Sequence, residues 1–112
     1  MIHGDLLNRN VLVSCGRITA VLDWGSSLYG DFLYDIAWLE FWAPWHPSME
    51  AAHIPTEARR HYQSLRLDVE DLDARLRCYM LHIGLDHQTY HAATGNFDEL
   101  TAITERTLGL IE

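Results

Sequence analysis

Two short apolar segments on either side of a glycine constrain the fold of this chain more than any other feature. Residues 10–14 and 18–22 are rich in the aliphatic and β-branched side chains typical of strands, and Cys15-Gly16-Arg17 lies between them as a turn. The pattern predicts a β-hairpin. Because a hairpin brings the start of its first strand beside the end of its second, we expect Asn10 and Asp23 to be neighbours in space.

Polar residues that can carry phosphoryl-transfer chemistry flank this hairpin. Asp5 and Asn10 stand five positions apart in the segment His-Gly-Asp-Leu-Leu-Asn-Arg-Asn, and Asp23 closes the second apolar run. One carboxylate can take the proton of an attacking hydroxyl, while an amide oxygen and a second carboxylate are hard oxygen ligands of the kind that Mg²⁺ prefers. The spacing therefore indicates a site for phosphoryl transfer.

The segment after the hairpin predicts a buried helix. Residues 33–42 are apolar on nearly every face, and Pro44 ends the pattern. Asp35 is the exception in this helix. A buried carboxylate without partners is costly, so we expect it to accept hydrogen bonds from the backbone of the loop that carries Asp5. The alternative is a first-turn aspartate that interacts favourably with the helix dipole alone.

Three further segments continue the helical pattern. Residues 42–55 contain three prolines and predict a loop or a broken helix. Residues 55–65 begin with a proline at a tolerated position and predict a short surface helix. The 3-4 spacing of apolar residues then predicts a long helix over about 69–93, with Asp68 as its cap.

The last helix has boundary signals of its own. Gly95 is a stop signal for the long helix before it. Asn96 followed three positions later by Glu99 is a capping-box pattern, and it predicts a final helix that ends near Leu108. The chain is therefore expected to consist of a hairpin followed by helices.

Composition and charge exclude several classes of protein. The formal net charge of −8 disfavours a nucleic-acid binder, which needs clustered Lys and Arg, but suits a polycationic small molecule. No apolar run approaches the ~20 residues of a membrane span and no leader opens the chain, so a cytoplasmic location is expected. Cys15 and Cys78 lack metal-site or disulfide spacing, which predicts reduced thiols, with Cys78 packed in its helix.

The polar motif and the segments after it resemble a known family. The sequence His3-Gly4-Asp5 with Asn10, a strand that ends in Asp-Trp-Gly, and residues 30–37 together resemble the aminoglycoside phosphotransferase and choline kinase-like family. Four segments are similar to its members that phosphorylate hygromycin B, namely residues 16–21, 41–45, 80–86 and 95–98. The resemblance runs from residue 3 to about residue 97.

This resemblance implies a fold class. We expect an α+β, mostly helical chain that forms the C-terminal part of a protein-kinase-like fold, with a catalytic loop, a β-hairpin and then a helical bundle. Residues 1–112 would form a single partial domain of that fold, from the catalytic loop onward. The family's N-terminal lobe would lie outside it.

The resemblance also implies roles for particular residues. Asp5 matches the catalytic aspartate, and Asn10 and Asp23 match the pair that holds Mg²⁺ against the phosphates of ATP. Asp35 matches an aspartate that steadies the catalytic loop, and His3 belongs to the framework of that loop. Mg²⁺ would be the metal cofactor, ATP the co-substrate and a small-molecule hydroxyl the acceptor.

Several side chains have two interpretations. Relatives often carry a cation at the second position after the catalytic aspartate; here Arg9 could contact a phosphate instead, or could be a solvated loop residue. Trp42 and Trp45 could stack on sugar rings, although core packing is favoured because aromatic residues are abundant inside domains. His87 and His91 lie one helical turn apart, but no third zinc ligand is evident, so solvated histidines on a helix face are favoured.

Two functions of different classes follow. The first is an ATP-dependent phosphotransferase that acts on an aminoglycoside or aminocyclitol antibiotic such as hygromycin B. The second is a truncated, non-catalytic remnant or interaction module, because the sequence has no glycine-rich loop before His3 and no lysine among its eight basic residues. Without the N-terminal lobe, apolar surface should be exposed on the hairpin and on the helix around Trp38, which predicts self-association or a partner chain.

Overall fold

The computed structural model describes the backbone of residues 1–112 and every side chain except that of Asn8. The predicted hairpin is confirmed: β1 (Val11–Ser14) and β2 (Arg17–Val21) pair antiparallel, with an irregularity after Leu12. The turn is shorter than expected and consists of Cys15 and Gly16, which both have positive φ angles, of 50° and 71°. A two-residue hairpin turn of type I′ requires positive φ at both central positions.

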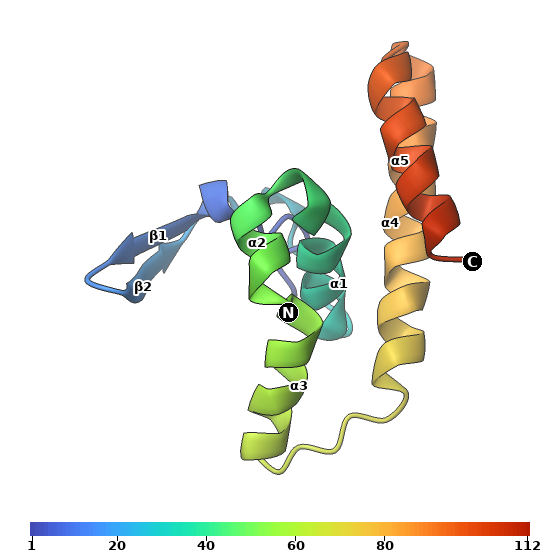
Figure 1. Cartoon of the computed structure of the whole chain (residues 1–112). Helices are drawn as coiled ribbons and strands as arrows, with labels where there is room; N and C mark the ends of the chain where they lie inside the picture. The colour runs from blue at the N-terminus through green and yellow to red at the C-terminus, as the bar shows by residue number, and fades with distance from the viewer.

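Helices make up most of the remaining chain, as the sequence predicts (Figure 1). In chain order, these are the 3-10 helix η2 (Trp24–Ser26), α1 (Leu33–Trp42), the 3-10 helix η3 (Ala43–Trp45), α2 (Pro47–Ala52), α3 (Ile54–Ser64), α4 (Leu72–Thr94) and α5 (Phe97–Gly109). A further 3-10 turn, η1 (Asn8–Asn10), precedes the hairpin. Figure 1 shows α4 and α5 side by side as a long pair, with the hairpin extending away from them.

Helix α1 is the centre of the core. Its side chains Leu33, Ala37 and Phe41 have no exposed surface, and they recur at the spacing of one helix face. This helix packs against α3 and α4, and α4 packs in turn against α5 through Ile83 and Ile103. Burial of these side chains is the main stabilising contribution to the arrangement.

The predicted boundary between α4 and α5 is confirmed. Gly95 has a left-handed backbone with φ of 73°, which ends α4, and the Asn96 side chain accepts a hydrogen bond from the Glu99 N–H at 3.4 Å. Nearer the middle of the pair the helices lie very close together. A Cβ atom on Gly84 would meet the Thr107 side chain, so only glycine allows this spacing.

Two predictions about the long helix are wrong. Asp68 does not cap it: α4 begins at Leu72, because Asp71 has a left-handed backbone with φ of 50° that a helix cannot continue through. Cys78 is not packed but exposed, since the buried face of α4 is formed by residues such as Leu76 and Ile83. Both cysteines are free, as predicted.

The predicted exposure of apolar surface holds for the hairpin and fails for α1. Leu12, Val13 and Ile18 are 48%, 63% and 68% exposed. Trp38, in contrast, is only 9% exposed, because the rings of Trp42 and other aromatic residues cover it. None of the helices in the described chain combines the length and the apolar character that crossing a membrane requires.

Candidate functional site

Asp35 fixes the loop that carries Asp5. It lies in the first turn of α1, and its two carboxylate oxygens accept hydrogen bonds from the backbone N–H of His3 at 2.7 Å and of Gly4 at 2.9 Å. These are the donors that the sequence suggested for this carboxylate. Charge-assisted bonds to neighbouring amides hold the start of the loop in one orientation relative to α1.

The His3 imidazole connects this loop to the end of the hairpin. It is 2% exposed; its Nδ1 accepts from the Asp5 N–H at 3.2 Å, and its Nε2 donates to the Leu22 carbonyl at 2.7 Å. Both ring nitrogens are therefore used, which requires the tautomer protonated on Nε2. Next to it, Gly4 lies so close to the Ser26 carbonyl that a Cβ atom would be 2.5 Å from that oxygen.

Asn10 and Asp23 lie at the base of the hairpin, as predicted from the sequence. The Leu22 N–H donates to the Asn10 carbonyl at 2.8 Å, and Asp23 is the next residue along the chain. The Asn10 side chain is buried, and its Nδ2 donates to the Asp5 carbonyl at 2.8 Å. Asp23 is exposed and has a left-handed backbone with φ of 58°. The loop thus binds Asn10 to Asp5 while the hairpin brings Asn10 beside Asp23.

The donor set at the base of the hairpin fits Mg²⁺. In the described part of the chain, neither the Asn10 Oδ1 nor the Asp23 carboxylate accepts a hydrogen bond. No group of three or more His, Cys, Asp or Glu side chains that could hold a metal occurs among the described residues. Mg²⁺ commonly takes only one or two protein oxygens and completes its coordination with phosphate and water, so Asn10 and Asp23 would suffice for such a site.

Arg9 forms an ion pair with Asp5 in this structure. Its Nη2 lies 3.1 Å from both carboxylate oxygens, and the Arg9 side chain is 63% exposed. An exposed pair of this kind contributes little to stability and exchanges readily with solvent or other ions. The Asp5 carboxylate is therefore accessible to a competing ligand.

A cavity of about 840 Å³ opens beside Asp5. Its walls are largely aromatic and come from α1, the segment that follows it and α4. They comprise Trp38, Trp42, Trp45, His46, His87 and Tyr90, together with Gly4, Asp5, Leu7, Arg9 and Ser26. A mainly aromatic pocket of this size with a few polar groups is typical of a small-molecule site.

The two interpretations of Trp42 and Trp45 are not exclusive. Their ring centroids lie 5.1 Å and 6.3 Å from that of Phe41, so both pack on the core. Both also line the cavity beside Asp5. Each is half-buried, so part of its surface remains open to a ligand in the cavity.

The favoured interpretation of His87 and His91 is wrong. Both are half-buried, because the long helix turns this face toward α1. The His87 ring centroid lies 5.4 Å from that of Trp38 and 4.9 Å from that of Trp42. The centroids of the two imidazole rings are 6.4 Å apart, and no third His, Cys, Asp or Glu ligand joins them among the described side chains.

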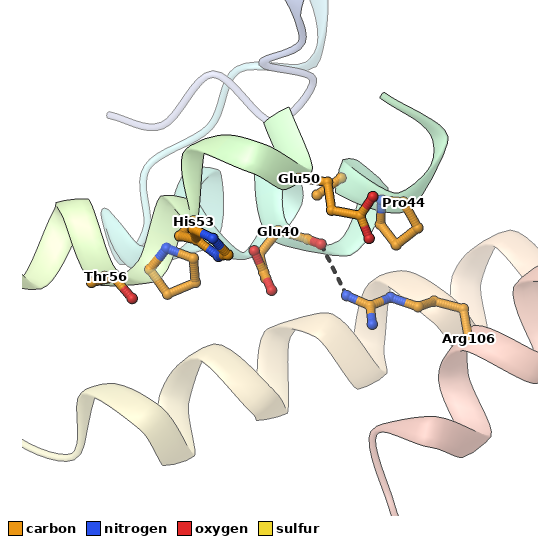
Figure 2. A pocket seen from close by; sticks show the side chains of 8 residues that line it. Glu40, Pro44, Glu50, His53, Thr56 and Arg106 are labelled. Carbon is orange, nitrogen blue, oxygen red and sulfur yellow. Dashed lines mark hydrogen bonds between the residues drawn. The ribbon is translucent and has the colours of Figure 1, made fainter. Parts of the chain in front are cut away.

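A second cavity, of about 440 Å³, shares no lining residue with the first (Figure 2). Here Arg106 of α5 donates to the carbonyl oxygens of Glu40 at 3.0 Å and Phe41 at 3.3 Å. These carbonyls belong to the last turn of α1, where a cation is favourable. Burial raises the pKa of the Glu40 carboxyl, although Arg106 and His53 oppose the shift. This contact joins two helices.

Sequence reasoning missed Trp38, His46, His87 and Tyr90 as residues of the first cavity. One signal was present: His87 and Tyr90 are three positions apart, so they lie on the same face of a helix. Which element that face meets depends on the packing of α4 against α1, and a periodic pattern alone does not contain this information.

Comparison with known proteins gives one family match, one curated relative and several similar solved structures. The sequence model described as "Phosphotransferase enzyme family" matches residues 1–67. Hygromycin-B 4-O-kinase of Escherichia coli is 38% identical over 99 residues, which are 88% of this chain and 27% of that protein. The chain thus spans less than a third of this curated relative.

Solved structures of aminoglycoside phosphotransferase APH(4)-Ia are also similar. A ternary complex of a thermostable mutant with ADP and hygromycin B has a TM-score of 0.79 and 36% identity over 98% of this chain and 35% of the other. A structure of the same phosphotransferase without the thermostabilising changes also has a TM-score of 0.79, with 38% identity. Two of the ternary complexes carry alanine in place of an aspartate and of an asparagine five residues after it. The fold is therefore the C-terminal part of a kinase-like fold, as predicted.

Proposed function

Because the chain belongs to the phosphotransferase enzyme family, we propose that it is the acceptor-binding and catalytic part of an ATP-dependent phosphotransferase. Its acceptor is the hydroxyl of an aminocyclitol antibiotic such as hygromycin B, and it acts in the cytoplasm. One observation carries this proposal. Asp5 borders a large aromatic cavity while its backbone carbonyl accepts from the Asn10 Nδ2 at 2.8 Å, so the residue proposed as proton acceptor is bonded to the residue proposed as metal ligand.

Asp5 is the residue that acts on the acceptor. In the proposed reaction its carboxylate orients the acceptor hydroxyl and takes its proton as the γ-phosphate of ATP is transferred. Asp35 and His3 keep the Asp5 backbone in place through their bonds to the loop. Arg9 leaves Asp5 when the acceptor arrives and contacts the phosphate, since its ion pair with Asp5 is exposed.

Asn10 and Asp23 hold Mg²⁺ in this proposal. The metal, when bound, neutralises charge on the phosphates of ATP. The relative described above has the same residue types, an aspartate and an asparagine, at the same separation of five positions as Asp5 and Asn10. That agreement supports the assignment of the pair to a nucleotide site.

The chemistry of the cavity supports an aminocyclitol as the acceptor. Trp42 and Trp45 offer ring faces on which a sugar or cyclitol ring can stack. The negative net charge of the chain attracts a polycationic ligand. A relative at 38% identity is a hygromycin-B 4-O-kinase, and related structures contain hygromycin B.

A second candidate function is a non-catalytic interaction module. It is favoured by an apolar groove of about 350 Å³ lined by Val13, Ile18 and Leu39 among others, at the base of the exposed hairpin. Such a surface suits self-association or the docking of the N-terminal lobe of a family member. This function requires no turnover of ATP.

The two functions are separated by an assay of phosphate transfer from ATP to hygromycin B, with the chain supplied as part of a complete enzyme. Asp5→Asn should lower kcat by about 100-fold or more, because it removes the proton acceptor. Asp23→Ala should raise the concentration of Mg²⁺ and nucleotide needed, while Asp68→Asn, an exposed loop change, should leave the rate unaltered. Turnover by Asp5→Asn at the wild-type rate would refute the proposed catalysis.

A further inference from the structure

His87 is held in a single orientation on the wall of the cavity that Asp5 also lines. Its Nδ1 lies 2.9 Å from the Ile83 carbonyl, one turn earlier in α4. A carbonyl oxygen can only accept, so Nδ1 carries the hydrogen of this bond. In the neutral imidazole the other nitrogen, Nε2, then has a free lone pair and is an acceptor.

The surroundings of the ring leave this acceptor unused. Trp38 and Trp42 pack edge-to-face against the imidazole and fix its plane. Within the described part of the chain, no hydrogen bond reaches the His87 Nε2. Among the described side chains, Nε2 of His87 is not one of the buried polar atoms without a partner, so solvent reaches it, and a donor group of a ligand in the adjacent cavity can replace that solvent.

We infer that His87 is a specificity-determining residue, whose Nε2 accepts a hydrogen bond from a hydroxyl or ammonium group of the acceptor molecule. The inference rests on the proposed function for the class of acceptor. Two acceptors, Asp5 and His87, then line one cavity with aromatic walls. A molecule rich in O–H and N–H donors on a ring, as an aminocyclitol is, fits this pattern better than an anionic acceptor does.

Substitutions at His87 separate this polar role from simple packing. His87→Phe keeps an aromatic ring against the two tryptophans but has no acceptor. His87→Asn can still donate to the Ile83 carbonyl but is too short to reach the Nε2 position. His87→Gln places an amide oxygen near that position. His82→Phe is the matched control, because His82 is exposed on the same helix and does not line the described cavity.

The measurement is the Kd of the 112-residue chain for hygromycin B, by isothermal titration calorimetry without nucleotide, after circular dichroism has shown that each variant is folded. We expect His87→Phe and His87→Asn to raise Kd by about tenfold or more, as for a lost hydrogen bond to a charged or polar ligand. His87→Gln and His82→Phe should stay within roughly threefold of the wild type. Because Phe and Asn disturb packing differently, either one that folds is sufficient for the test.

Two results overturn the inference. Wild-type affinity in a folded His87→Phe or His87→Asn chain would mean that Nε2 makes no contact with the ligand, and the proposed phosphotransferase would be unaffected. A wild-type chain that binds no hygromycin B would refute both the role of His87 and the proposed acceptor. His87-dependent binding without phosphate transfer by a complete enzyme would support the inference and refute the proposed catalysis.

Discussion

Asp31 lies two residues before α1 and Asp35 lies in the first turn of α1, yet the two aspartates bind different parts of the molecule. Asp31 faces the long helix: its Oδ2 accepts from Arg75 at 2.7 Å and from the Tyr79 hydroxyl at 2.8 Å, and its Oδ1 accepts from the Leu33 N–H at 3.0 Å. Asp35 faces the loop and accepts hydrogen bonds from backbone N–H groups. One aspartate joins two helices, while the other joins a helix to the candidate catalytic loop.

The difference shows that of two carboxylates close together in the sequence, one can stabilise the fold while the other positions the candidate site. The side chain of Asp31 is 17% exposed, and it stabilises the packing of α1 on α4. Asp35 does not touch α4 in this way; its bonds set where the Asp5 loop lies relative to the aromatic cavity. Substitutions at the two positions should therefore have distinct effects on stability and on ligand binding.

The largest effect is expected for Asp35→Ala. It leaves the N–H groups of His3 and Gly4 without acceptors in a partly buried site, which should lower the free energy of unfolding by about 3 kcal/mol. Urea denaturation of the chain measures this. The folded fraction should also bind hygromycin B more weakly, because Asp5 is displaced. Unchanged binding would mean that Asp35 does not position the Asp5 loop for the ligand.

Asp31→Ala should lower the free energy of unfolding by less, about 2 kcal/mol. Water can replace part of the hydrogen bonding that the partly exposed Arg75 guanidinium loses. The same urea denaturation measures it. Affinity of the folded protein for hygromycin B should change by less than about threefold. A larger loss of affinity than in Asp35→Ala would contradict the division of roles between the two aspartates.

The pH dependence of stability should sharpen the comparison for Asp31. Burial raises the pKa of its carboxyl, but the bonds from Arg75, the Leu33 N–H and Tyr79 outweigh burial and hold the pKa below its ordinary 3.8. The folded state therefore binds this proton less readily than the unfolded state does. The stabilisation should be complete above pH about 4 and be lost as the pH falls through the lowered pKa. The free energies of unfolding of the wild type and of Asp31→Asn, measured by urea denaturation, should converge as the pH falls through this lowered pKa. A constant difference between them down to pH 2 would mean that the ionised Asp31 carboxylate does not stabilise the fold.

The smallest effect is expected for Tyr79→Phe, which removes one of the bonds to Asp31. We expect a loss of about 1 kcal/mol, and the loss should nearly vanish when the substitution is made in the Asp31→Ala background. A double-mutant cycle from urea denaturation measures this coupling. Full additivity of the two losses would mean that the hydroxyl does not stabilise the carboxylate.

Local patterns in the sequence predicted the elements whose causes are local. The hairpin follows from alternating β-branched residues and a glycine turn, and the boundary at Gly95 and Asn96 follows from capping chemistry. Asp5, Asn10 and Asp23 were identified because their residue types and spacing match phosphoryl-transfer chemistry, and the structure brings Asn10 to Asp5 and to the end of β2.

The parts that the sequence did not predict depend on distant contacts. Asp31 and Arg75 are 44 positions apart, and nothing near either residue marks their pairing. The same is true of His87, whose position on the cavity wall depends on how α4 crosses α1. Cys78 was misplaced for a related reason: helical periodicity gives the spacing of a buried face, and one residue of error in phase turns a side chain to solvent.

At the end of β2, the left-handed backbone of Asp23 sets the stability of the chain against the presence of a carboxylate at this position. With φ of 58°, this position would suit glycine better, and an L-residue with a side chain pays about 1 kcal/mol of strain there. A glycine at this point would make the chain more robust to heat or denaturant and would delete a carboxylate from the base of the hairpin. Selection of variants for thermal stability alone would therefore favour replacement of Asp23 by glycine and the loss of its carboxylate from the candidate site.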